Sequence, residues 1–155
     1  MNLILQYSAV SLASFAGLVV GMLLIYANID ELKPARKYLI ISQKIVWAAI
    51  ITVTALVYSL PAYAVLIILL FTVLPFADKR QINSSSMYLL LGIIFYLSAK
   101  SVMLFALNAG LIFLFGLPTG TLSRIDEDGN IKKEFAADFI KNLGFFISIP
   151  LFFLL

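Results

Sequence analysis

Lys100 and Asn108 are the two residues whose chemistry contrasts most with their surroundings. Both lie in Met87–Leu117, a run of 31 residues in which Lys100 is the only charged side chain. Ionisable groups inside a membrane are costly and are typical of functional sites. A desolvated lysine beside an amide would suit an anion site or a proton-coupled step. The competing interpretation, which we favour, places Lys100 at an outer surface, either snorkelling to headgroups or in a turn.

Several other chemistries are excluded by residue type or spacing. The chain has no Cys and no His, which removes thiol nucleophiles, disulfides and histidine metal sites. The stretch DEDGN (126–130) lacks the first and last ligands of a calcium loop, and GLPTG (116–120) lacks the lysine of a phosphate-binding loop. No paired carboxylates fall inside an apolar run. We therefore expect no metal, no cofactor and no enzymatic activity.

The composition is that of a membrane protein. Apolar residues make up 63% of the chain, charged residues 12%, and the mean hydropathy is +1.06. Soluble domains average about 45–50% apolar and about 25% charged residues. The sequence therefore predicts an all-α, polytopic transmembrane helical bundle, with residues 1–155 forming a single integral membrane domain.

Apolar runs and helix-breaking residues predict where the helices lie. The expected helices cover about 3–27, 34–59, 62–77 and 134–155, and the last is expected to bend at Gly144 and Pro150. The first apolar stretch is too long for a signal-peptide core and has no basic residue before it, so we expect it to be retained. Trp47 lies deeper than tryptophan usually prefers, which indicates packing between helices.

The run 87–117 allows two topologies. As one helix it would extend about 46 Å, well beyond a hydrocarbon core of about 30 Å. Asn108 and Gly110 tolerate the left-handed conformation that ends helices, so we favour one span over about 87–108, a short interfacial piece at 111–117, a loop at 118–134 and five spans in all. The alternative is a hairpin turning at Ser98–Ser101, which gives six spans.

The basic residues in the expected loops predict the orientation of the chain, and one of these loops fits six spans better than five. Lys and Arg number three in 28–37, none at 60–61, two in 78–86 and three in 118–134. Basic residues favour the cytoplasmic side, so the chain is predicted in the plasma membrane with its N-terminus outside. The loop 118–134 obeys this rule only with six spans. The placement of Tyr96 at an interface also favours six.

A stripe of small residues in the first expected helix predicts close helix packing. Ala9, Ala13, Gly17 and Gly21 recur at every fourth position. Such small residues let two helix backbones approach closely in a membrane. The partner helix could belong to the same chain or to another one.

The net charge of +3 and the isoelectric point near 9.2 have a membrane explanation. Most basic residues flank apolar runs, where anionic lipid headgroups at the cytoplasmic face are the expected partner and nucleic acid is not. The expected headgroup-binding residues are Lys33, Arg36, Lys37, Lys44, Lys79 and Arg80.

Two functions fit these features. The first is a non-enzymatic helical bundle, an accessory or oligomerising subunit of a membrane assembly, which is motivated by the small-residue stripe. The second is a small transporter or channel subunit with a polar intramembrane site around Lys100 and Asn108.

Overall fold

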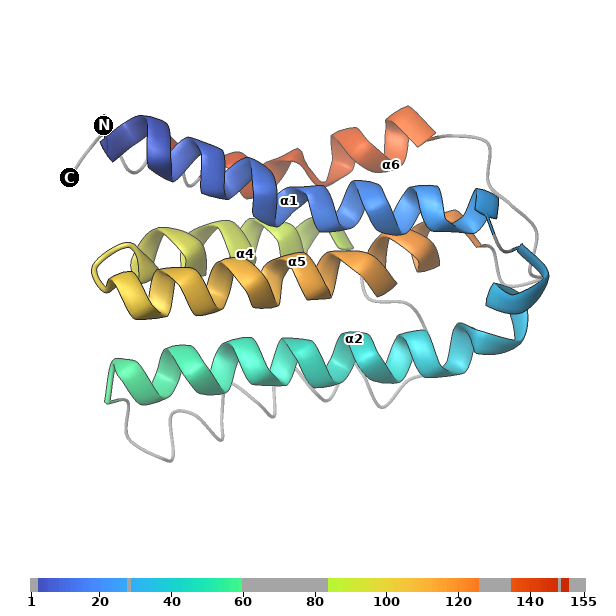
Figure 1. Ribbon diagram of the computed structural model, residues 1–155, viewed down its shortest axis with the longest axis horizontal. Helices are drawn as coiled ribbons and strands as arrows, with labels where there is room; N and C mark the ends of the chain where they lie inside the picture. The colour runs from blue at the N-terminus through green and yellow to red at the C-terminus, as the bar shows by residue number, and fades with distance from the viewer. Residues whose placement is uncertain (1–2, 28, 60–83, 126–134, 148, 151–155) are drawn as a thin grey trace.

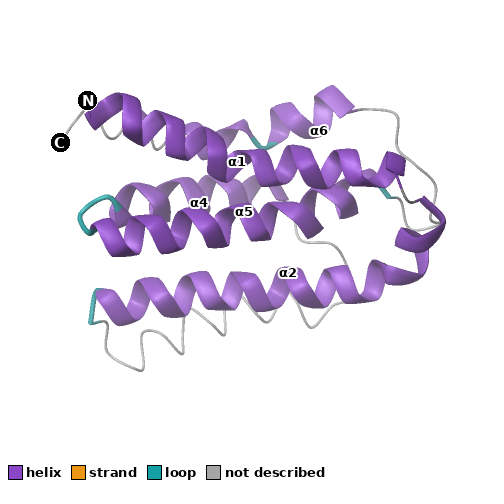
Figure 2. Cartoon of the chain, viewed as in Figure 1, coloured by secondary structure: helices purple, strands orange, loops and turns teal. Residues whose placement is uncertain are grey.

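The computed structural model describes residues 3–27, 29–59, 84–125, 135–147 and 149–150. These residues form helices joined by short turns (Figure 2), which confirms the all-α prediction for this part of the chain. The helix expected at 62–77 lies outside the described residues. The elements are α1 (Leu3–Ala27), α2 (Ile29–Val57), α4 (Ser84–Ser98), α5 (Val102–Arg124), α6 (Phe135–Lys141) and the 3-10 helix η1 (Leu143–Ile147).

Helix α5 lies at the centre of the bundle and touches α1, α2 and α4. It runs parallel to α1, since Tyr7 stacks on Phe105 near the start of both helices and Tyr26 contacts Arg124 near their ends. It runs antiparallel to α2, because Gln43 pairs with Thr119 and Thr54 pairs with Asn108. Figure 1 shows the helices side by side along the long axis of the molecule.

The bundle has two ends, which are named here by the basic residue that marks each. The Arg124 end holds the last turns of α1 and α5 and the first turns of α2, while α4 begins part-way along the bundle, where Tyr88 lies beside Phe115. The Lys100 end holds the start of α1, the end of α2 near Tyr58 and the turn between α4 and α5. Tyr58 donates a hydrogen bond from its hydroxyl to the carbonyl oxygen of Leu97, which fixes α2 beside that turn.

Within the described ranges, three helices are long and apolar enough to cross a membrane: Leu5–Tyr26, Pro34–Val57 and Val102–Arg124. A fourth apolar helix, Ser86–Ser98, is shorter. The first helix matches the predicted bounds of 3–27. The second begins five residues before the predicted start, since α2 contains Pro34 instead of beginning there.

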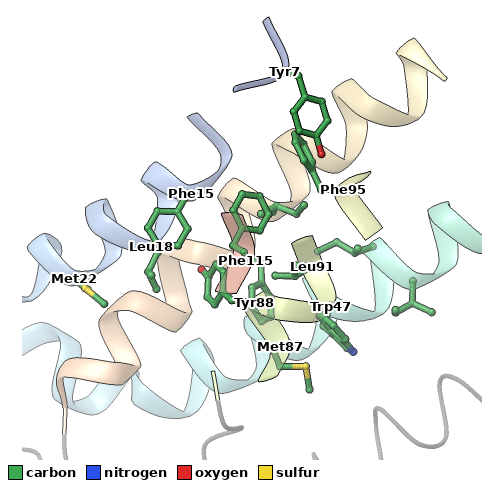
Figure 3. Close-up of a cluster of buried hydrophobic side chains, with 14 residues drawn as sticks. Tyr7, Phe15, Leu18, Met22, Trp47, Met87, Tyr88, Leu91, Phe95 and Phe115 are labelled. Atoms are coloured by element: carbon green, nitrogen blue, oxygen red, sulfur yellow. The ribbon is translucent and has the colours of Figure 1, made fainter. Parts of the chain in front are cut away.

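Aromatic and aliphatic side chains from five elements fill the core (Figure 3). Phe15 of α1 lies between two other elements, with ring centroids 5.7 Å from Tyr88 of α4 and 5.9 Å from Phe145 of η1. Trp47 of α2 is 1% exposed and its ring lies 5.6 Å from that of Phe115 of α5. This confirms the prediction that Trp47 packs between helices.

The single helix predicted over 87–108 is wrong, because the chain turns at Ala99–Ser101. Serine side chains explain the turn. Ser98 donates to the carbonyl oxygen of Phe95 at 2.6 Å, and Ser101 has extended backbone angles and caps α5 by accepting from the Leu104 amide at 3.4 Å. Such local bonds compete with the helix ladder. The hairpin at Ser98–Ser101, which we had placed second, is the observed arrangement.

Asn108 and Pro118 do not interrupt α5, so the predicted break at 108–110 and the loop beginning at 118 are both wrong through Arg124. Asn108 has its side chain bonded to α2 rather than to its own backbone. Pro118 lacks an N–H group and would normally break a helix. The helix nevertheless continues to Arg124. Thr119 and Thr121 donate to the carbonyl oxygens of Phe115 and Leu117 at 2.7 and 3.0 Å, whereas the carbonyl that loses its donor to Pro118 is that of Leu114.

The last predicted helix is divided in the structure. Helix α6 ends at Lys141, and η1 follows after the turn at Asn142. Asn142 donates from its side-chain amide to the Asp138 carbonyl oxygen at 2.7 Å. The bend predicted at Gly144 is thus found close to that residue. η1 packs on α4, where a Cβ at Gly92 would collide with the Phe145 carbonyl group.

Candidate functional site: the faces of the central helix

Lys100 and Asn108 occupy different environments. Lys100 is exposed and lies in the turn before α5. Asn108 is completely buried on α5, and its Nδ2 donates to Thr54 Oγ1 of α2 at 3.2 Å. The structure therefore shows the surface placement of Lys100 and does not join the two side chains by any contact among the described residues.

Asn108 has more hydrogen-bonding capacity than its surroundings use. Its Oδ1 atom is buried and accepts no hydrogen bond from the residues that the structure describes. A second buried amide, Gln43 of α2, lies closer to the Arg124 end and donates from Nε2 to Thr119 Oγ1 at 2.9 Å. The contact between α2 and α5 thus contains two polar links separated by apolar packing, of which Trp47 on Phe115 is a part.

The small-residue stripe finds its partner inside the chain. A Cβ added at Gly17 would collide with the carbonyl oxygen of Phe113, and one at Gly21 with that of Leu117. The opposite helix has glycines at the same spacing, since Cβ atoms at Gly116 and Gly120 would collide with the α1 backbone. Thr121 Oγ1 also donates across this contact to the Gly21 carbonyl oxygen at 2.9 Å. Two glycine pairs therefore hold two parallel helices at backbone contact.

Gly116 and Gly120 were missed by the sequence reasoning, although their signal was present. They are spaced like Gly17 and Gly21, but Pro118 between them was interpreted as the start of a loop. A proline within an apolar helix is tolerated when neighbouring groups satisfy the freed carbonyl. The four-residue spacing of Gly116 and Gly120 correctly indicates a helix contact, whereas Pro118 wrongly indicates a loop.

The other half of the stripe faces outward. Ala9 and Ala13 are exposed, whereas Gly17 and Gly21 are buried. Positions four apart advance by about 40° around a helix of 3.6 residues per turn, so the stripe winds away from α5 toward the N-terminus. On α5, Ala106 and Gly110 are also exposed, and a Cβ at Gly110 would meet nothing within 4 Å.

Two of the predicted headgroup-binding residues whose side chains are described lie toward the Arg124 end, and a third does not. Lys37 is exposed and Arg36 is half-buried near the start of α2, whereas Lys44 is half-buried in the middle of that helix. Lys33 lies in α2, and Lys79 and Arg80 lie outside the described residues. Lys100 is the one Lys or Arg in the described ranges that lies at the opposite end.

Arg124 is the charged residue that the sequence reasoning did not single out. It is 1% exposed in the last turn of α5, and its Nη2 donates to the Tyr26 hydroxyl at 2.6 Å. The guanidinium carbon lies 5.8 Å from the ring centroid of Tyr26 and 5.6 Å from that of Phe135. Its Nε and Nη1 atoms are buried and have no hydrogen-bond acceptor among the described residues. The helix C-terminus favours a cation here, which was the available signal.

No group of three acidic, histidine or cysteine side chains within the described ranges is placed to hold a metal ion. No protein-family model, curated protein or solved structure matches the chain. The function is therefore argued from the side chains described above.

Proposed function

We propose that the chain is an integral membrane helical bundle without enzymatic activity that acts as an accessory or oligomerising subunit. The proposal of a membrane location is supported by the apolar side chains that the long helices expose on their outer faces. Large apolar side chains are exposed on α1, α2 and α5, among them Leu12 at 60%, Leu56 at 73% and Met103 at 74%. Apolar faces of this extent on a soluble monomer would be unusual, whereas lipid covers them at no cost.

The hairpin at Ala99–Ser101 brings the charge distribution into agreement with the positive-inside rule. Arg36, Lys37 and Arg124 share one end of the bundle, and Lys100 lies at the other. Because Lys and Arg concentrate on the cytoplasmic side, we place the Arg124 end in the cytoplasm and the N-terminus outside. The plasma membrane is the proposed location.

Cysteine labelling tests this orientation cleanly because the chain has no cysteine of its own. The exposed residues Lys37, Ser86 and Lys100 are replaced one at a time by cysteine and treated with an impermeant thiol reagent on intact and opened cells. We expect Lys37→Cys and Ser86→Cys to react only after opening, and Lys100→Cys to react from outside. Labelling of Ser86 and Lys100 from the same side would contradict the proposal.

The proposal that the chain oligomerises is supported by small residues that are exposed on the surface of α5. Glycine inside a helix costs about 1 kcal/mol relative to alanine, and no neighbour in the described part of the chain requires a glycine at position 110. Exposed Ala106 and Gly110, spaced four apart, offer the close-approach surface that membrane helices use to associate. We propose that a second copy of the chain packs on this part of α5.

Gly110→Leu tests the assembly surface, with Val102→Leu as a matched control on the same helix, since Val102 is 87% exposed. The mass of the protein is measured in a mild detergent by native mass spectrometry. We expect Gly110→Leu to shift the protein to monomer and Val102→Leu to leave its mass unchanged. A monomeric wild-type protein would overturn the assembly proposal and leave the membrane proposal standing.

The transporter or channel alternative ranks second. It needs Lys100 and Asn108 to line one polar pocket, whereas Lys100 is exposed in a turn and Asn108 is buried against Thr54. The unused Oδ1 atom of Asn108 is the observation that keeps a polar intramembrane site in consideration. Unchanged ion flux in vesicles containing Asn108→Leu would dismiss it.

A further inference from the structure

Arg124 carries a buried positive charge that no carboxylate in the described part of the chain balances. A guanidinium is always protonated and offers five N–H donors. One of its nitrogens donates to Tyr26, while Nε and Nη1 are buried without an acceptor. Burying an unbalanced ion is strongly unfavourable. The carboxylate of Asp138 on α6 does not bond Arg124, and its Oδ2 atom is itself without a hydrogen-bond partner. Among the residues that the structure describes, no anion accompanies Arg124.

Tyr26 connects this charge with the surface. Its side chain is 55% exposed, although its hydroxyl oxygen accepts the hydrogen bond from the buried Arg124. A tyrosine hydroxyl can accept and donate together, so the Tyr26 hydrogen remains available to an external acceptor. A hydroxyl group that accepts a hydrogen bond from a cation is polarised by it. This polarisation makes the hydroxyl a stronger hydrogen-bond donor to a third group. The pair thus presents the charge of Arg124 at the surface through one hydroxyl group.

The location favours a phosphate as that acceptor. Tyr26 and Arg124 end the first and fifth helices at the end of the bundle that also holds Arg36 and Lys37. Aromatic and basic side chains at such a position meet lipid headgroups in a membrane.

We propose that Tyr26 and Arg124 form a binding site for the phosphate group of an anionic lipid headgroup. Tyr26 donates to a phosphate oxygen, and Arg124 positions and polarises Tyr26. The site goes beyond the lysine-rich edge predicted from the sequence, because it depends on a buried residue and on two helices that meet only in the folded chain. It rests on the proposed membrane location.

The test measures how much anionic lipid the purified full-length protein retains. Wild type and variants are extracted in detergent, mixed with phosphatidylglycerol or phosphatidylcholine, and examined by native mass spectrometry for bound lipid. Tyr26→Phe removes the hydroxyl and keeps the ring, whereas Arg124→Gln removes the charge. Tyr38→Phe is the matched control, since Tyr38 is 72% exposed on α2 at the same end. Lys100→Gln controls for loss of a charge at the opposite end.

We expect Tyr26→Phe and Arg124→Gln each to weaken phosphatidylglycerol binding about tenfold, the effect of losing one hydrogen bond to a charged group. Tyr38→Phe, Lys100→Gln and phosphatidylcholine binding should be unchanged. Unaltered phosphatidylglycerol binding in Tyr26→Phe, which keeps the packing of the ring, overturns the proposal. A lower melting temperature of Arg124→Gln with unaltered lipid binding also overturns it, because Arg124 would then be paired within the chain.

A competition arm identifies the source of the phosphate. An excess of inorganic phosphate that leaves phosphatidylglycerol bound supports the lipid as ligand. Complete displacement would overturn the lipid assignment and give the site to a free phosphate. Cysteine labelling reports on the membrane location separately, so failure at the lipid site is distinguishable from failure of the proposed function.

Discussion

The two halves of the α1–α5 pair use small residues in opposite ways. Toward the Arg124 end, Gly17 and Gly21 meet Gly116 and Gly120, and the helix backbones touch. Toward the Lys100 end, Ala9, Ala13 and Gly110 are exposed. The charges follow the same division, since Arg124 is buried and Lys100 is not. Small residues at the same spacing thus bring the helix backbones together in one half of the pair (the closed half) and are exposed in the other half (the open half).

The largest expected effect comes from bulk in the closed half. Gly116→Leu should destabilise the protein by about 3 kcal/mol or more, because its side chain would enter the α1 backbone and neither helix can yield without separating. Thermal unfolding in detergent, followed by circular dichroism, measures the loss. The matched change in the open half, Gly110→Leu, should leave the melting temperature of the single chain within a few degrees. Equal losses would erase the distinction between the halves.

A smaller effect is expected from the polar links between α2 and α5. Thr119→Val leaves the buried Gln43 amide without its acceptor and should cost about 1–2 kcal/mol. Thr54→Val removes the acceptor of Asn108 in the open half, where Thr54 is half-buried, and should cost less. The comparison uses unfolding free energies of both variants. A larger loss for Thr54→Val would show that the Lys100 end is the more tightly packed one.

Gly110→Ala should stabilise the isolated monomer by up to about 1 kcal/mol, since alanine is the better helix former and its Cβ meets open space. The unfolding free energy is measured at a protein concentration low enough to separate any oligomer. The same substitution at Gly17 should destabilise, because even one methyl group collides with the Phe113 backbone. A stabilised Gly17→Ala would refute the backbone contact.

The smallest effect on stability is expected for a substitution of Lys100. Lys100→Gln should change stability by less than about 0.5 kcal/mol, as is usual for an exposed turn residue. Flux measurements on vesicles containing this variant provide the functional check. Lost flux with unchanged stability would restore the transporter interpretation and make Lys100 a functional residue despite its exposure.

The sequence predicted the helices that follow from long apolar runs. It did not predict helix ends that depend on the hydrogen bonds of single side chains. The helix over 3–27 follows from an uninterrupted apolar run and is confirmed. The division of 87–117 depends on Ser98 and Ser101, whose hydrogen bonds to nearby backbone end one helix and begin the next. Apolar content cannot register such bonds, since serine is common in membrane helices as well.

The candidate site was predictable only in part, because burial depends on which helices meet. Lys100 was conspicuous through its apolar neighbours in sequence, yet the turn exposes it. Arg124 follows a Pro- and Thr-containing stretch that looked like a loop, yet α1 covers it through Tyr26. The glycine partners at 116 and 120 were hidden by Pro118, which lies inside α5 without ending it. Each error came from judging a residue by its sequence neighbours instead of its spatial ones.

The parallel pairing of α1 with α5 has a consequence for synthesis in the cell. Gly21 leaves the ribosome about 95 residues before Gly116, so at about 5–20 residues per second the α1 surface waits roughly 5–20 s for its partner. The chain loses conformational entropy when this long loop closes, and the α1–α5 contact stabilises the protein only after that closure. During this interval the glycine backbone of the first helix has no α5 to cover it, so the contact at Gly17 and Gly21 forms only after most of the chain has been made.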